Sequence, residues 1–550
     1  MQLGDGNKAK LEKRNVSLEK TPRLNKPLWI STVSVILGLT IFFMFFPDQS
    51  SKALNAAMSF CVGPLGWVYL WGCFACFALT LYFGFGRLGR IKFGGPDAKP
   101  DFSFMRWVAM VFFGSCGTST YYWATIEWAY YYKGGPGSTP FDIVPGTWNA
   151  ADWASTYSMF HQGAIGWSVY IPFALCIGYM YYNRKVHILR VSEACRPVLG
   201  KMVDGALGKA IDFFVIFGMI GGLVSSFGFA APFVANAICF VVGAEYSFTW
   251  AVFYQLAISI AQSVVLYLGL RKGSAKVTGI VNYLMYAFLG YVLLTGPTAF
   301  IISQFSTSFG NMITNFTKMA FWTDAVGNSG FPQAWTIFFF AWWVTFAPTM
   351  GIFIAKISKG RTMGQTAISM VAGGCIGVWL PYTIMGNFAM HLDITGKLPV
   401  SDMIMASDGS AGAAANIIIQ VLQQLPLSFL VIPALIALCF ISSTTATSAT
   451  VYSFAASTTE TLGIDVEPAR WNRVFWVWLT VAIGISVQII GGVGALKTAS
   501  TVSILPLFAV LIIVTMSLFK MLKEDGLLNN DNIIYAPMVK DEIEGKTDQL

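Results

Sequence analysis

The chain has 550 residues, of which 55% are hydrophobic and 11% are charged, with a formal net charge of +8 at pH 7. A water-soluble domain of this size would present more charge to solvent, so the composition excludes a soluble globular protein and indicates a protein of the lipid bilayer. The sequence offers no soluble basic domain, which argues against nucleic-acid binding.

Apolar stretches of about 20 residues or more, each long enough to cross the hydrocarbon core as a helix, recur along the chain. Twelve are predicted, at 28–46, 66–85, 104–132, 152–181, 210–242, 247–270, 278–304, 334–357, 366–391, 427–459, 471–491 and 498–520. Amphipathic helices are expected at 309–321 and 411–424, along the membrane surface. The predicted fold class is an all-α polytopic membrane protein.

Basic residues fall in alternate loops, and short loops rich in Lys and Arg are retained on the cytoplasmic side. They include Arg87, Arg90, Arg184, Lys185, Arg190, Arg271, Lys272, Lys356, Lys359 and Arg470. The pattern predicts a multi-pass protein of a bacterial-type inner (plasma) membrane, with cytoplasmic tails at 1–27 and 521–550. The nine cysteines lie mostly in apolar stretches and are interpreted as buried thiols.

Two apolar stretches are interrupted in a comparable way, which is typical of transporters built from inverted repeats. The third contains a Gly/Ser/Thr run from Gly114 to Thr120, and the eighth contains Ala347-Pro348-Thr349-Met350-Gly351. Five stretches separate their starts, so two repeats of opposite topology are predicted at 104–304 and 334–520, after two peripheral helices in 28–103. The alternative is that the small residues only permit close helix packing.

Hydroxyl side chains gather in two further stretches, at Ser225 and Ser226 and at Ser442 and Ser443. Neutral oxygen ligands without a carboxylate suit a monovalent cation such as sodium better than a divalent cation. The alternative is that these hydroxyls bond to carbonyls of their own helices.

Aromatic residues recur at helical spacing. Trp335, Phe339 and Trp342 are spaced for one helical face, as are Trp123 and Tyr130, and Trp167 and Tyr170 lie three residues apart. A trimethylammonium group has no N–H to donate, so ring faces recognise it, each contributing about 0.5–2 kcal/mol. The set favours an aromatic box, although for each tryptophan taken alone packing or an interfacial belt is the favoured explanation.

Few ionisable residues lie inside the apolar stretches. Glu127 is one, and it is either functional or a structural carboxylate at the rim of a pathway. His161 is interpreted as a hydrogen-bonded helix residue rather than a proton relay. No nucleophile–base pair is visible, so no enzymatic activity and no cofactor are predicted, and a membrane-embedded enzyme is a remote alternative.

Four segments carry a resemblance to the betaine/carnitine/choline transporter family: 126–130, 330–335, 341–343 and 357–362. The resemblance extends over essentially all twelve stretches. It implies a homotrimer whose protomers have the LeuT-like fold of sodium symporters, with two inverted five-helix repeats, and which moves a methylated ammonium or sulfonium compound by alternating access. Carried over by position, the box consists of Trp167, Tyr170 and Trp343, with Trp342, Trp123 and Tyr130 close to the substrate route.

Three positions depart from the family pattern. Gln162 stands where many relatives have tryptophan, which makes an N-oxide substrate plausible. Met350 resembles a position of sodium-independent carnitine antiporters, but Val281 stands where those antiporters place an arginine.

The resemblance implies a sodium site formed by the backbone from Phe113 to Cys116 and the hydroxyls of Ser442 and Ser443, with Ser225 and Ser226 as candidates for a second site. The expected function is sodium-coupled import of trimethylamine N-oxide, trimethylamine, choline, glycine betaine, carnitine or dimethylsulfoniopropionate. A sodium-independent substrate/product exchanger is the alternative.

Overall fold

The computed structural model describes residues 23–114, 117–135, 137, 139–186, 188, 190–269, 274–460, 467–490 and 492–528. Within these ranges the regular structure is helical, and pairing of extended segments is limited to two isolated bridges, Leu24 with Thr459 and Lys92 with Thr362. The all-α prediction is confirmed. The predicted tails fall mainly on residues 1–22 and 529–550, outside the described ranges.

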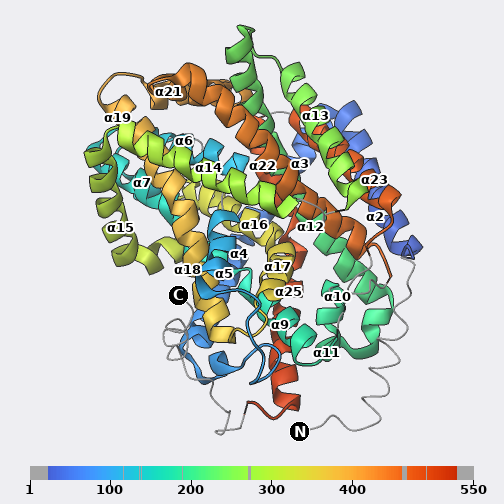
Figure 1. The fold of residues 1–550 in the computed structure, drawn as a ribbon. Coiled ribbons are helices and arrows are strands. Elements are labelled where there is room, and N and C mark those ends of the chain that lie inside the picture. The colour runs from blue at the N-terminus through green and yellow to red at the C-terminus, as the bar shows by residue number, and fades with distance from the viewer. Residues whose placement is uncertain are drawn as a thin grey trace, which may run out of the picture.

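The long helices in chain order are α2 (Lys26–Phe45), α3 (Pro47–Val62), α4 (Gly66–Phe85), α5 (Phe104–Gly114), α6 (Thr118–Lys133), α7 (Trp148–His161), α9 (Ile171–Tyr182), α12 (Ala206–Val242), α13 (Phe248–Leu268), α14 (Ser274–Thr295), α15 (Thr298–Phe321), α17 (Ala347–Ile357), α18 (Met363–Pro381), α21 (Ala411–Gln423), α22 (Ser428–Ser457), α23 (Arg470–Ile490), α24 (Gly492–Ser503) and α25 (Leu505–Glu524). Shorter ones are α8 (Ala164–Ser168), α10 (Val191–Ala194), α11 (Arg196–Leu199), α16 (Ile337–Thr345), α19 (Asn387–Ile394) and α20 (Val400–Ala406). Helices α2, α13 and α23 pack together at one edge, with α15 at the opposite edge (Figure 1).

Nine helical segments of the described chain are long and apolar enough to cross a membrane, and two bent helix pairs raise that number to eleven. The predicted stretch 104–132 corresponds to α5 and α6, which flank residues 115 and 116, outside the described ranges. The count of twelve therefore stays a prediction.

The end predicted for the helix at 278–304 is wrong. Helix α14 stops at Thr295, and α15 leaves it at an angle of 108°. Pro297 explains the bend, because it lacks an N–H and disfavours helical backbone at the residue before it. The amphipathic helix expected at 309–321 is the second half of α15, whereas the one expected at 411–424 is α21.

The predicted break in the eighth stretch is present. Helix α16 ends at Thr345, α17 begins at Ala347, and the two are bent by 50°. Pro348 lies in the first turn of α17, where its missing N–H removes no helical hydrogen bond. A π-helical turn, η4 (Pro332–Thr336), precedes α16. Such turns hold an extra residue and occur frequently at functional sites.

The fourth stretch is also broken, which the sequence analysis did not anticipate. Helix α7 ends at His161, and the short α8 begins after Gly163. The last carbonyls of a helix have no partner within it. The break therefore leaves carbonyl groups available inside the protein.

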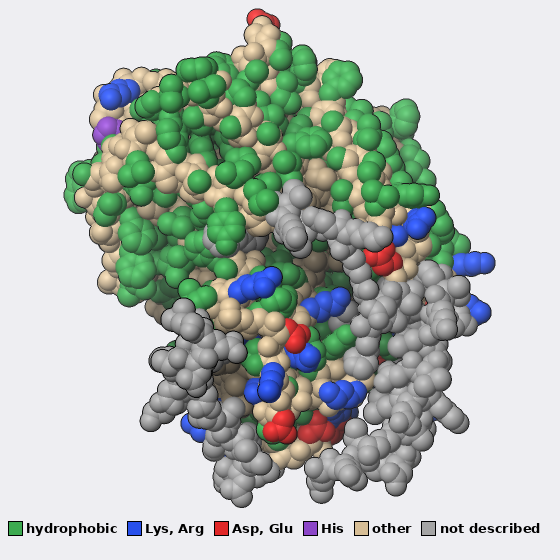
Figure 2. Space-filling model, viewed as in Figure 1, with side chains coloured by type: hydrophobic (Ala, Val, Ile, Leu, Met, Phe, Trp, Pro, Cys, Tyr) green, Lys and Arg blue, Asp and Glu red, His purple; other side chains and the backbone are tan. Residues whose placement is uncertain are grey.

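Charged side chains gather at the end of the molecule where α10 and α11 lie, while apolar side chains cover most of the remaining face (Figures 1 and 2). At that end Arg184 of the loop after α9 bonds Glu524 and Asp525, which ties the end of α25 to α9. The eight described cysteines are buried and free, as expected, and Cys116 lies outside the described residues.

Candidate functional site

Three aromatic rings from two broken spans meet in the interior. Trp167 belongs to α8, Tyr170 lies just before α9, and Trp343 belongs to α16. The ring centroids of Trp167 and Trp343 are 5.3 Å apart, those of Trp167 and Tyr170 5.3 Å, and those of Tyr170 and Trp343 5.9 Å. The three residues expected to form the box therefore lie in mutual contact.

Two glycines permit this close approach. A Cβ atom at Gly374 of α18 would lie 2.3–2.5 Å from three ring atoms of Trp167, and one at Gly166 would lie 2.6 Å from Cδ1 of Trp343. Real Cβ atoms do not approach other atoms so closely. Glycine at these positions is therefore required for the rings to lie where they do.

The break between α7 and α8 fixes one ring of the box. The indole Nε1–H of Trp343 donates to the backbone carbonyl of His161, 2.9 Å away. This carbonyl is free to accept because α7 ends at His161. The ring of Trp343 is thereby held by a helix other than its own.

Buried polar atoms without a partner among the described residues lie in the segment that carries the box. They are Nε1 of Trp167 and Oγ of Ser168, both on residues at most 2% exposed. An unpaired buried donor costs about 1–3 kcal/mol unless a ligand or water satisfies it. This stretch of chain is therefore suited to a ligand that presents an acceptor as well as a methylated nitrogen.

Trp123 and Tyr130 of α6 form a second aromatic cluster around Trp335 of η4. The ring centroid of Trp335 is 6.0 Å from that of Trp123 and 5.1 Å from that of Tyr130. Trp342 connects to this cluster through Phe338, on which it stacks at 6.0 Å. The predicted route residues thus lie in one aromatic region. Its central ring, Trp335, precedes Trp343 by eight residues, or about two helical turns, whereas Trp342 is adjacent to Trp343 in sequence.

Lys497 of α24 lies in this second cluster. Its Nζ is 3.4 Å from the ring centroid of Trp335 and 5.1 Å from that of Phe338, and the residue is only 7% exposed. The sequence analysis missed it, because the predicted stretch 498–520 began one residue too late. The apolar run in fact starts at Val493, and a lysine four residues inside it is the signal that was available.

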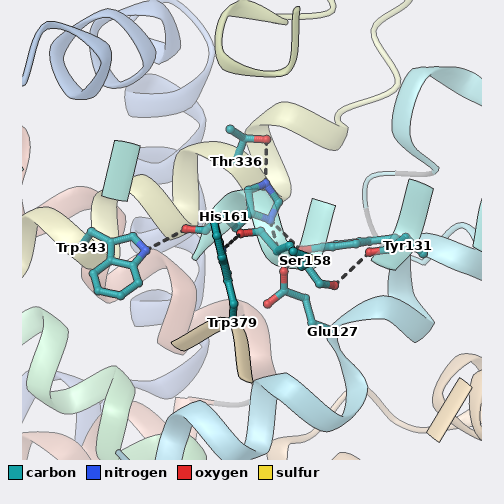
Figure 3. A network of polar contacts seen from close by, with 9 residues as sticks. Glu127, Tyr131, Ser158, His161, Thr336, Trp343 and Trp379 are labelled. Atoms are coloured by element: carbon teal, nitrogen blue, oxygen red, sulfur yellow. Dashed lines mark hydrogen bonds and ion pairs between the residues drawn. The ribbon is translucent and has the colours of Figure 1, made fainter. Parts of the chain in front are cut away.

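Glu127 is fully buried in a hydrogen-bonded network rather than at an exposed rim (Figure 3). Its Oε1 accepts from the hydroxyl of Tyr131 at 2.8 Å and lies 3.2 Å from Nδ1 of His161. Nε2 of His161 is 3.1 Å from Oγ1 of Thr336. Both ring nitrogens of His161 are engaged, in agreement with a hydrogen-bonded helix residue.

The hydroxyls considered for sodium separate into two groups. Oγ of Ser443 lies 2.8 Å from Oγ1 of Thr118, the first residue of α6, and Ser442 is buried beside it on α22. Thr118 was not among the predicted ligands. The predicted backbone ligands run from Phe113, at the end of α5, to Cys116, which lies outside the described residues.

Ser225 and Ser226 make contacts of a different kind. Ser225 Oγ bonds Ser500 Oγ at 2.7 Å and so links α12 to α24, whereas Ser226 Oγ donates to the carbonyl of Gly222 in its own helix at 3.0 Å. Ser225 Oγ also lies 3.0 Å from the carbonyl of Gly221 in its own helix, so both serines have a contact that fits the back-bonding alternative. The two positions compared with the carnitine antiporters are Met350 and Val281. Met350 is half-buried in α17, and Val281 is buried in α14.

Membrane-length helices, broken spans and an aromatic core into which the amino group of Lys497 projects define a polytopic membrane protein with an aromatic interior. Residues 27–527 match the model of BCCT, the betaine/carnitine/choline family of transporters, so the chain belongs to that family. Members are secondary transporters of such compounds and are not enzymes.

Proposed function

We propose that the protein is a sodium-coupled importer of a methylated ammonium, N-oxide or sulfonium compound, with Trp167, Tyr170 and Trp343 as its substrate box. The mutual contact of these three rings, from two interrupted spans, is the observation that carries the proposal. Ring faces replace water around a methylated nitrogen, which offers no N–H to a conventional acceptor. Alternating access opens this box first to one side of the membrane and then to the other, as the protein rocks around a fixed midplane site.

The substrates proposed are trimethylamine N-oxide, trimethylamine, choline, glycine betaine, carnitine and dimethylsulfoniopropionate. The indole N–H of Trp167, which has no acceptor among the described residues, and the buried amide of Gln162 support those that carry an oxygen close to the nitrogen. A screen of the six compounds by thermal stabilisation of the purified protein, with and without sodium, tests the proposal. Absence of stabilisation by all six would contradict it.

For the coupling ion, we place sodium next to Ser443 and Ser442, with Thr118 as an additional oxygen ligand. The support is the 2.8 Å contact between Ser443 and Thr118, which brings hydroxyls of α22 and α6 together. Each sodium ion that enters down the membrane potential contributes about 2.3 kcal/mol per 100 mV, enough to concentrate substrate tens-fold.

Ser443→Ala is expected to raise the sodium concentration for half-maximal uptake about tenfold, because it removes one oxygen ligand and one partner of Thr118. At saturating sodium, substrate affinity is expected to change little. Uptake into proteoliposomes across a sodium series measures both quantities. Ser453→Ala is the matched control, since Ser453 bonds only the carbonyl of Ala449 in the same helix. An unchanged sodium dependence would remove Ser443 from the site.

A sodium-independent exchanger is the second candidate, favoured by Met350 in α17. Proteoliposomes loaded with unlabelled substrate distinguish the two. Exchange that persists without sodium supports the exchanger, and net uptake that requires a sodium gradient supports the symporter.

The assembly and orientation belong to the same proposal. We infer a homotrimer in a bacterial-type inner membrane, with both termini in the cytoplasm. The charged end of the molecule, where Arg184 and Arg196 lie, supports a cytoplasmic position for the loop after α9. Accessibility of cysteines introduced at Lys201 and Val326, on loops predicted to lie on opposite sides, tests the orientation.

A further inference from the structure

The side chain of Lys497 places its amino group against aromatic rings. The same kind of contact, between a nitrogen-centred cation and ring faces, is proposed for the substrate in the neighbouring box. Nζ of Lys497 lies over the face of Trp335 at 3.4 Å, and no hydrogen bond or ion pair of that Nζ is present among the described residues. A charge buried in the membrane interior is costly unless an opposite charge or an oriented group compensates it.

Glu127 supplies an opposite charge in the same core, with no direct contact between the two. Tyr131 joins them: its hydroxyl donates to Glu127 at 2.8 Å, and its ring contacts Trp335 with centroids 5.0 Å apart. A chain of contacts therefore runs from the carboxylate of Glu127 on α6, through the rings of Tyr131 and Trp335, to the ammonium of Lys497 on α24.

Both residues are connected to the substrate box through short chains of contacts. The ring of Trp335, over which Nζ of Lys497 lies, belongs to a residue eight positions before Trp343. Eight residues correspond to about 12 Å along a helix. Glu127 reaches Trp343 through His161, whose ring lies 3.2 Å from the carboxylate and whose carbonyl accepts from the indole at 2.9 Å. At an effective dielectric constant of about 20, a unit charge 12 Å away changes the affinity for a second unit charge about tenfold.

We propose that Lys497 and Glu127 form a compensated charge pair that sets the charge selectivity of the box, so that the protein prefers substrates with no net charge, namely N-oxides and zwitterions, over organic cations. This inference rests on the proposed function of the box. With both charges present, the field of one offsets that of the other at the box. A neutral dipolar substrate enters without adding net charge to the core, whereas a cation adds one.

The test uses two probes of nearly the same size, trimethylamine N-oxide and tetramethylammonium, and compares their dissociation constants in binding assays at saturating sodium. The selectivity is the affinity for tetramethylammonium divided by that for the N-oxide. Lys497→Met leaves Glu127 uncompensated and is expected to raise this ratio about tenfold. Glu127→Gln leaves Lys497 uncompensated and is expected to lower it about tenfold.

Two further variants separate charge from packing. The double variant Lys497→Met/Glu127→Gln is expected to return the ratio to within about twofold of the unmodified protein, because the two effects have opposite sign. Lys497→Arg keeps the charge and is expected to leave the ratio unchanged, as is Lys520→Met, which removes an exposed lysine from α25. If Lys497→Met does not fold, the shift produced by Glu127→Gln still tests the pair.

An unmodified protein that binds neither probe nor glycine betaine or choline contradicts the proposed function, and the inference with it. Binding with the same ratio in all variants contradicts the charge pair alone. Equal weakening of both probes by Lys497→Met also contradicts it, because that result would assign Lys497 a packing role.

Discussion

Trp343→Leu is expected to weaken substrate binding about 100-fold and to abolish measurable uptake. The substitution removes a ring face from the box, worth about 0.5–2 kcal/mol, and the hydrogen bond to the His161 carbonyl, worth about 1 kcal/mol. It also removes the ring against which Trp167 and Tyr170 pack. Isothermal titration at saturating sodium measures the affinity, and proteoliposome uptake measures the transport.

Two controls accompany this variant. Trp343→Phe keeps a ring but loses the N–H donor, so its affinity is expected to fall only about tenfold. Trp67→Leu removes an exposed tryptophan of α4 and is expected to leave binding unchanged. Full affinity in Trp343→Leu would show that the substrate site lies elsewhere.

Gly374→Ala is expected to reduce substrate affinity by at least tenfold, although the substitution replaces no aromatic residue. The added Cβ would lie 2.3 Å from Cδ2 of Trp167, so the ring must leave its place in the box. Overpacking of this kind typically costs about 1–3 kcal/mol. The same titration measures the loss, and thermal unfolding shows whether the variant remains folded.

The loss of affinity in Gly374→Ala is expected to arise from displacement of the Trp167 ring, and a double variant tests this origin. In a Trp167→Leu background, Gly374→Ala is expected to cause little further loss, because the ring that it displaces is absent. Gly290→Ala is the matched control, since a Cβ at Gly290 of α14 meets nothing within 4 Å. Additive losses in the double variant would exclude a shared mechanism.

Most of the helices could be predicted from sequence because hydrocarbon thickness sets their length and composition. The errors arose where local chemistry overrides hydropathy. Pro297 ends α14 in the middle of an apolar run, and α7 ends at His161 before a glycine. Lys497 was not predicted because the start of the apolar stretch was placed after it, and a lysine outside such a stretch is interpreted as a flanking residue at the membrane surface.

The candidate site was accessible from the sequence only in part. Spacing places Trp167 and Tyr170 on neighbouring turns, but it cannot bring Trp343 to them, and the resemblance to the family supplied that step. The contact between Thr118 and Ser443 joins residues 325 positions apart. The pairing of Lys497 with Trp335 likewise joins distant helices, and such contacts are set by tertiary packing, about which one-dimensional periodicity says nothing.

The hydrogen bond between the Trp343 indole and the His161 carbonyl has a consequence for transport. The indole of Trp343 is anchored to α7 although α16 carries it, so the shape of the proposed box depends on how α7 and α16 are positioned relative to each other. Any relative displacement of these helices must either break that anchor or carry the indole along. Occupancy and helix position are then thermodynamically linked, and the ligand favours the arrangement in which its walls are complete.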